Sequence, residues 1–296
     1  MLARIPSTWR HTGPIRSVQV RARPEGERIP LLADWPRLLD AIRDAGEVVL
    51  QVRHRYGRLI GCGQLPALSW DATGQNARGG GDGHALDLHT ARWAHACGRV
   101  RTCARCCSPG GIFIHDHGDA GFLQICPPAR ASATRWAHLL DEWRSGPPLP
   151  PASRPPAAAF SALPVALPAS ARPLGGEAAT LLALLQAVID QKLAIGCALE
   201  TAGARQYREF VPRHLALENG LLILSGDGVV AQVILPVIAG LALDDADDAA
   251  PAGRRGGVLH LVNADGSSLL SVGPASGPPA ATRWRTVLRS AFAGLR

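Results

Sequence analysis

Two stretches of the chain share an order of apolar and polar positions that predicts a β-hairpin. Residues 111–128 and 257–274 each contain two apolar runs that flank a centre of His, Asp, Asn and Gly, and each ends at a proline. These central residues tolerate the positive φ of tight turns, so each stretch is expected to form two antiparallel strands. After a short gap, Ala133 and Ala281 each begin the tetrapeptide Ala-Thr-Arg-Trp, which opens an amphipathic segment. This recurrence predicts an internal duplication.

A helix and a strand are expected before each hairpin. In the first half, Asp34 has the position of a helix N-cap and Gly46 that of a C-cap glycine, with apolar residues at helical spacing between them. A strand is predicted to follow at 47–52. In the second half, 177–193 predicts a helix and 194–199 a strand. Each half is therefore expected to be α+β, with antiparallel sheets flanked by helices.

A change of composition separates the halves. Residues 145–173 are rich in Pro and Ala, which neither continue a helix nor form a β-ladder, so they are typical of a semi-rigid linker. The predicted organisation is a first half over 1–146, a linker over 147–174 and a second half over 175–296. The glycine-rich residues 74–83 are expected to form a flexible loop.

Composition and charge are typical of a soluble globular protein that does not bind nucleic acid. The 296 residues are 47% hydrophobic, which is ordinary for a soluble globular protein. The formal charge of +7 comes from arginines scattered along a chain whose only lysine is Lys192, and no basic run of five occurs, so a nucleic-acid partner is not expected. The N-terminus lacks the apolar core of a signal peptide and no stretch reaches the length of a membrane span, which predicts a cytoplasmic protein. Seven cysteines, an odd number, do not indicate a disulfide framework.

Four stretches of the chain are similar to motifs of one known family. The entry segment Trp35-Pro36-Arg37-Leu38-Leu39 through Gly46-Glu47-Val48 is similar to W-x-x-L-L…L-G-x-V, and Arg53 has the position of the arginine in T-R-N. The remaining similarities are Leu86-Asp87-Leu88-His89 with Trp93-Ala94-His95 (I-D-L-R…W-x-H), the turns His117-Gly118-Asp119-Ala120 and Asn263-Ala264-Asp265-Gly266 (F-D-A-x-G-x-A), and Gly203-Ala204-Arg205-Gln206 (G-C-I-Q-I-H). With these motifs the chain resembles the HemS/ChuX family of bacterial haemin-utilisation proteins.

The resemblance extends over about residues 35–290 and implies a tandem duplication of a HemS/ChuX-like unit. It also implies a cytoplasmic protein that binds haem for uptake, trafficking or degradation, with a protein that delivers or accepts haem as a partner. Three departures from the family pattern bear on the haem site. The segment leading into the second half contains no histidine, the arginine of D-L-R is His89, and the histidine of Q-I-H is Arg208. The usual haem site of the family is therefore not matched residue by residue, and both a relocated site and a loss of haem chemistry are left open.

A haem site requires an axial ligand for the iron, an apolar surface against the porphyrin, and cations that neutralise the two propionates. His89, at a position that faces the ligand in the family, is the preferred donor, and the alternative is a histidine packed at a sheet edge. His54 lies among Arg53, Arg55 and Arg58, which could supply a donor and propionate anchors, or could form an exposed basic turn.

The second half offers a comparable group. It consists of Tyr207 with Arg205 and Arg208, in which the phenol is either a donor or a core side chain.

A zinc site is the alternative metal chemistry. The chain contains Cys103, Cys106 and Cys107 shortly before His115 and His117. Cysteine thiolates and histidine imidazoles are the ligand types that zinc prefers. Binding or carriage of haem is favoured over catalysis, and haem degradation, in which iron and a reductant would do the chemistry, is left open. Two further alternatives are a relative without haem that acts as a regulatory or partner-binding module, and a zinc-binding module.

Overall fold

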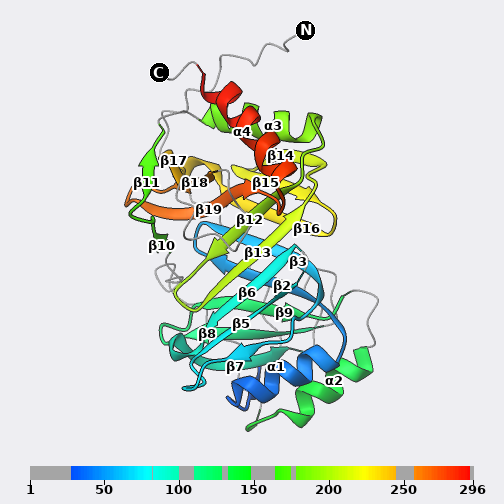
Figure 1. The fold of residues 1–296 in the computed structure, drawn as a ribbon. Helices are drawn as coiled ribbons and strands as arrows, with labels where there is room; N and C mark the ends of the chain where they lie inside the picture. The colour runs from blue at the N-terminus through cyan, green and yellow to red at the C-terminus, as the bar shows by residue number, and fades with distance from the viewer. Residues whose placement is uncertain are drawn as a thin grey trace.

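The computed structural model describes residues 28–81, 83–99, 110–128, 133–147, 164–174, 178–244 and 257–293. Two antiparallel sheets form the body of the protein, and two pairs of helices lie at its opposite ends (Figure 1). In the first half the elements are β1 (Ile29–Leu31), α1 (Trp35–Asp44), β2 (Glu47–His54), β3 (Gly57–Gln64), β4 (Ser69–Trp70), β5 (Asn76–Gly81), β6 (His84–His89), the short 3₁₀ helix η1 (Thr90–Arg92), β7 (Trp93–Arg99), β8 (Gly111–Asp116), β9 (Gly121–Cys126) and α2 (Ala133–Glu142).

The same order of elements, with one additional strand before the opening helix, recurs in the second half. These elements are β10 (Val165–Ala166), β11 (Ala171–Pro173), α3 (Ala178–Asp190), β12 (Ile195–Glu200), β13 (Ala204–Phe210), β14 (His214–Glu218), β15 (Leu221–Gly226), β16 (Val229–Ile234), η3 (Leu235–Val237), β17 (Gly240–Asp244), β18 (Val258–Val262), β19 (Ser267–Pro274) and α4 (Pro278–Phe292).

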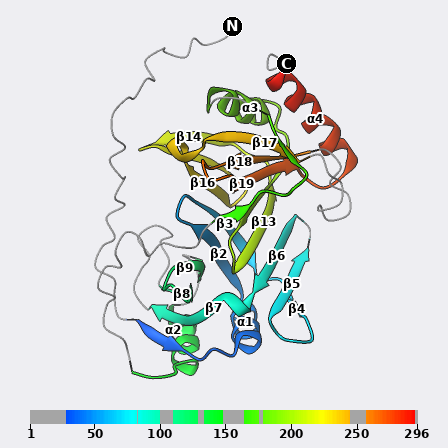
Figure 2. The same ribbon diagram turned by 90° about the vertical axis from the view of Figure 1, so that its left-hand side faces the viewer.

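Each half gives three strands to the sheet of the other half. The 9-stranded sheet has the order β1-β7-β8-β9-β2-β3-β16-β15-β14, and the 10-stranded sheet has the order β11-β17-β18-β19-β12-β13-β6-β5-β4, with β10 paired to β19. The exchange takes place where β16 pairs with β3 and where β6 pairs with β13. Figure 2 shows β6, β5 and β4 continuing from β13 away from the rest of the second half. The two halves are thus joined by backbone hydrogen bonds in both sheets.

The opening helix of each half forms for the reasons visible in the sequence. The Asp34 carboxylate accepts a hydrogen bond from the backbone N–H of Arg37, and Gly46 follows the last turn of α1 with a φ of +113°. The apolar stripe of α1, Leu38, Leu39 and Ile42, is fully buried against the sheets. The predicted helix and strand at 177–193 and 194–199 are observed as α3 and β12.

Two equivalent hydrogen bonds confirm the internal duplication at the level of side chains. Arg135, from the first Ala-Thr-Arg-Trp tetrapeptide, donates from Nη2 to the carbonyl oxygen of Asp44, the last residue of α1 (2.7 Å). Arg283, from the second tetrapeptide, donates in the same way to the carbonyl oxygen of Gln191, just after α3 (2.6 Å). In each half, the closing helix therefore holds the C-terminal end of the opening helix.

Two expectations about irregular segments were wrong. Residues 76–81, expected within a flexible glycine-rich loop, form β5, because β6 supplies a partner for every residue of this strand. The described part of the proline-rich segment forms two short ladders, β10 with β19 and β11 with β17, although no ladder was expected there. The division into halves at 146 and 175 stays a prediction.

No helix in the described ranges is both long enough and apolar enough to cross a membrane.

Candidate functional site

The basic residues predicted to converge at the end of β2 point to separate partners. Arg53 donates from Nε to the carbonyl oxygen of Gly121 (2.6 Å), and Arg58, on β3, donates from Nε to Oε1 of Gln232 (2.6 Å). Arg55 is exposed in the turn between the two strands. Arg53 and Arg58 lie directly opposite each other in the β2–β3 pair, so their side chains share one face of the sheet, and their role as propionate anchors stays a prediction.

His54 is buried, with 6% of its surface exposed. The backbone N–H of Tyr56 donates to Nδ1 (3.1 Å), so the ring proton lies on Nε2, which donates to the carbonyl oxygen of Leu269 (2.8 Å). Burial lowers the pKa of this imidazole from its ordinary 6.5 to about 4. Because both nitrogens are engaged, His54 has no lone pair for a metal in this arrangement.

The predicted group in the second half is divided between the two faces of β13. Tyr207 is buried, and its hydroxyl donates to Oε1 of Glu209 (2.7 Å). Arg208 points to the opposite face and is only 8% exposed. Its guanidinium lies over β3, so that a Cβ added at Gly61 would come within 2.5 Å of Nε. Burial lowers the pKa of Arg208. Tyr207 and Arg208 therefore cannot face one ligand, because neighbouring residues of a strand point in opposite directions.

His89 lies at the end of β6, and its side chain is the last of three polar side chains that are connected by hydrogen bonds. The amide Nδ2 of Asn76 donates to the carboxylate of Asp71 (2.6 Å), which fixes the amide orientation and leaves Oδ1 of Asn76 facing Nδ1 of His89 (2.9 Å). An amide oxygen can only accept, so Nδ1 of His89 carries the proton and Nε2 bears a lone pair. Hydrogen bonds from Asn76 and Thr73 keep the pKa of Asp71 well below its usual range.

Cations lie on the same sheet face as His89. Asp87 is two residues before His89 on β6, so both side chains point to one side of the sheet. Two arginines pair with Asp87: Arg78 through Nε (3.4 Å) and Arg205 through Nη1 (3.7 Å). Arg205 also lies 3.6 Å from Glu200. Of the three residues predicted in the second half, only Arg205 is brought near His89.

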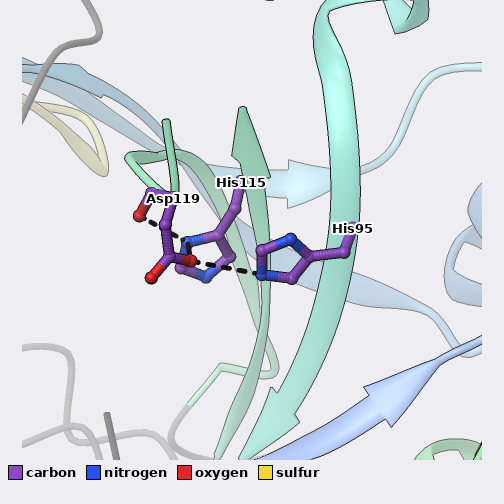
Figure 3. Close-up of side chains that lie close together, drawn as sticks. All are labelled: His95, His115 and Asp119. Carbon is purple, nitrogen blue, oxygen red and sulfur yellow. Dashed lines mark hydrogen bonds and ion pairs between the residues drawn. The ribbon is translucent and has the colours of Figure 1, made fainter. Parts of the chain in front are cut away.

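The predicted zinc ligands Cys103 and Cys106 lie outside the described residues, but His115 lies in a cluster that the sequence did not reveal. Figure 3 shows His115 of β8 beside His95 of β7, with Asp119 of the following turn pointing at both. Oδ1 of Asp119 is 3.3 Å from Nε2 of His95 and 3.3 Å from Nδ1 of His115. The two imidazole rings are stacked, with centroids 4.7 Å apart. His117 is exposed in the turn.

A small apolar cavity in the second half contains none of the predicted donors. Leu181 and Leu185 of α3 line it together with leucine, valine and alanine side chains of β15, β16, β18 and β19. Every side chain that lines it is apolar. It supplies no axial ligand and no cation.

Solved structures share the arrangement of the two sheets. PhuS, a haem-binding protein from Pseudomonas aeruginosa, aligns over 89% of this chain and 86% of its own, with 16% identity and a TM-score of 0.71. The chain has the fold of PhuS. ChuS, a haem oxygenase from E. coli, aligns over 90% and 89%, with 14% identity and a TM-score of 0.69. No protein-family model and no curated protein sequence matches the chain. The likeness to PhuS and ChuS confirms the predicted α+β fold with two similar halves.

Sequence reasoning missed the residues that surround His89 and His115. Asn76 was hidden in a stretch read as a loop, and it faces His89 only because β5 and β6 pair in a register that places the two opposite each other. His95 and Asp119 were present in motifs shared with the haemin-utilisation family, but the sequence assigned them no ligand role. Irregular pairing at Trp93/His95 and at Ile114/His115 accompanies the cluster, and such bulges leave no clear signal in a sequence.

Proposed function

We propose that this chain is a haem-binding protein that carries haem in the cytoplasm, with His89 as the axial donor. The observation that carries the proposal is the fold likeness, over about nine-tenths of the chain, to one protein described as haem-binding and to another described as a haem oxygenase. Both ring nitrogens of His54 are engaged in hydrogen bonds, and Tyr207 is buried with its hydroxyl bonded to Glu209. The contact between Asn76 and His89 leaves a lone pair on Nε2 of His89, so we prefer His89 as the donor.

His89 has the state that an iron ligand requires. Asn76 accepts the Nδ1 proton, which leaves the Nε2 lone pair for a metal, and a hydrogen-bonded Nδ1 is the usual companion of a metal-bound histidine. His89 is half-buried, so part of the residue is accessible from solvent. Asp71 holds Asn76 in turn, so the imidazole orientation is set before any ligand binds.

Arg205 and Arg78 are the propionate anchors in this proposal. Guanidinium groups bind carboxylates through paired hydrogen bonds, and both arginines reach the face that His89 occupies. Their present partner, Asp87, is contacted at 3.4 and 3.7 Å, so an incoming carboxylate could compete for them.

Bound haem would supply the iron and its open coordination positions. In this proposal the residues around His89 bind haem and orient the imidazole, and they do not transfer protons. The two nearby carboxylates, Asp71 and Asp87, are already held by hydrogen bonds or ion pairs and are therefore not assigned as proton donors or acceptors. This favours carriage over degradation, with a haem-delivering or haem-accepting protein as the partner.

The test is a titration of the purified chain with haemin, followed by the Soret band. We expect saturation at one haemin per chain, a shifted Soret maximum in the wild type and in His214→Ala, and loss of that shift in His89→Ala. His214 is an exposed histidine on β14 and serves as the matched control. Transfer of intact haem to excess apomyoglobin would support carriage. Unchanged haemin absorbance in the wild type, or a full Soret shift in His89→Ala, would contradict the proposal.

A further inference from the structure

We propose that His95, His115 and Asp119 form a binding site for one divalent transition-metal ion, with zinc as the probe. The site lies on the 9-stranded sheet, whereas His89 belongs to the 10-stranded sheet, so this inference does not depend on haem binding. Two imidazoles and one carboxylate are a donor set that zinc and other first-row divalent ions accept.

Two of the three spacings between the donor atoms match those of a tetrahedral ion. All three donor atoms lie within 4.8 Å of one another, and both contacts of Asp119 Oδ1 with imidazole nitrogens measure 3.3 Å. With metal–ligand bonds of about 2.0–2.1 Å, neighbouring ligands of a tetrahedral zinc ion lie about 3.3 Å apart. The carboxylate therefore already stands at ligand distance from each histidine. Binding requires a rotation of the stacked rings, so that both lone pairs meet at one point.

The hydrogen bonds of His115 define its present tautomer. The backbone carbonyl oxygen of Asp119 lies 3.1 Å from Nδ1 of His115, so this nitrogen carries the ring proton, which must move to Nε2 before Nδ1 can bind an ion. Sγ of Cys97 lies 3.4 Å from Nε2 of His115, and it gives the second nitrogen of that ring a partner. Such outer contacts orient metal-bound histidines.

The site is open on one side. The side chains of His95 and Asp119 are 42% and 48% exposed, whereas that of His115 is 8% exposed. An ion can therefore enter from solvent, and three protein ligands leave a fourth position for water, as in open zinc sites.

The positive charge of Arg28 lowers the affinity of this site for a metal ion. Its Nη2 lies 3.5 Å from Oδ1 of Asp119 and 3.4 Å from Nε2 of His95, where it neutralises the carboxylate while no metal is bound. A divalent ion must displace this contact and accept a positive charge close by. Replacing Arg28 with an uncharged residue should therefore strengthen metal binding.

The experiment is zinc calorimetry on the chelator-treated full chain in a Cys103→Ser, Cys106→Ser, Cys107→Ser background, which removes competing thiolates. We expect one zinc per chain, with a dissociation constant raised at least about a hundredfold by His95→Gln or Asp119→Asn. His117→Gln, in the same turn, should bind as the parent does, and Arg28→Gln should bind about tenfold more tightly.

Absence of zinc binding in the parent, parental affinity in His95→Gln and Asp119→Asn, or weaker binding in Arg28→Gln would overturn the inference. If circular dichroism shows that the serine background does not fold, the same variants are loaded with Co²⁺ in the chain with native cysteines. A cobalt spectrum without thiolate charge-transfer bands that is lost in His95→Gln supports the site. A purely thiolate spectrum that persists in His95→Gln overturns it.

Discussion

Nε2 of His54 lies 2.8 Å from the carbonyl oxygen of Leu269, so a histidine at the end of β2 is hydrogen-bonded to β19 of the other half. The same ring accepts the backbone N–H of Tyr56 and thereby also shapes the β2–β3 turn. One side chain thus couples a local turn to a contact between residues 215 positions apart.

The first prediction concerns this coupling. His54→Ala should lower the free energy of unfolding by about 2–3 kcal/mol, because it leaves a buried carbonyl without its donor and opens a cavity. Urea unfolding measures the change, and the exposed His214→Ala should stay within about 0.5 kcal/mol of the wild type. Haemin stoichiometry should be unchanged in folded His54→Ala. A lost Soret shift at unchanged stability would show instead that His54 is a ligand.

The second prediction is a loss of stability in mild acid. Folded His54 takes up a proton only near pH 4, whereas the unfolded chain does so near 6.5, so its contribution is complete above about pH 6.5 and is lost as the pH falls toward 4. Between pH 7.5 and 5.0, His54 should lower the free energy of unfolding by about 2 kcal/mol. His115, with its pKa also lowered to about 4, adds a change of the same sign.

Denaturant unfolding at the two pH values separates these contributions. In His54→Gln, the free energy of unfolding should keep the part of its pH dependence that is due to His115 and lose the part that is due to His54. An undiminished pH dependence in His54→Gln would contradict the assignment.

The third prediction concerns the orientation of His89. Asn76→Ala removes the acceptor of the Nδ1 proton, so haemin affinity should fall about tenfold, the size expected for an outer partner of a metal ligand. Gln75→Ala, the neighbouring exposed position, is the control. Without haem, the ¹⁵N shifts of His89 should show the Nδ1–H tautomer in the wild type and a mixture in Asn76→Ala. Identical tautomers in both proteins would mean that Asn76 does not set the ring.

The fourth prediction tests the packing of the two halves at Gly203. A Cβ at this position would lie 2.6 Å from Cζ of Phe122, while the carbonyl of Gly203 accepts hydrogen bonds from the indole of Trp93 and the backbone of His89. Gly203→Ala should destabilise the protein by about 1–3 kcal/mol.

Gly240→Ala is the matched control, because nothing lies within 4 Å of its added Cβ. It should leave the melting temperature nearly unchanged. Equal melting temperatures for the two variants would refute the close packing at Gly203.

The sequence predicted those elements whose signals are local. Asp34 and Gly46 bound α1 because capping depends on a few adjacent residues, and the two hairpins turn at residues that accept positive φ, Asp119 (59°) and Gly266 (81°). The strand β5 was missed because its glycines have no strand propensity of their own, and it forms only because β6 pairs with it.

Side-chain convergence was harder to predict than the fold. Arg53, His54 and Arg55, like Tyr207 and Arg208, were grouped because they are adjacent in sequence. In extended strands, adjacency places side chains on opposite faces, so His54 is separated from Arg53 and Tyr207 from Arg208, whereas Arg53 and Arg58 lie opposite each other across the β2–β3 pair. The residues that do meet, Asn76 with His89 and His95 with Asp119, are brought together by strand register, which tertiary pairing decides.

The exchange of strands between the sheets also bears on how such a protein could arise. Either half alone would leave β3 or β13 with an unpaired edge and its own three-stranded arm without a place to dock. A second copy of the same half would satisfy both needs at once, by reciprocal donation around a two-fold axis. This geometry predicts that an undoubled unit would complete both of its sheets as a strand-swapped dimer.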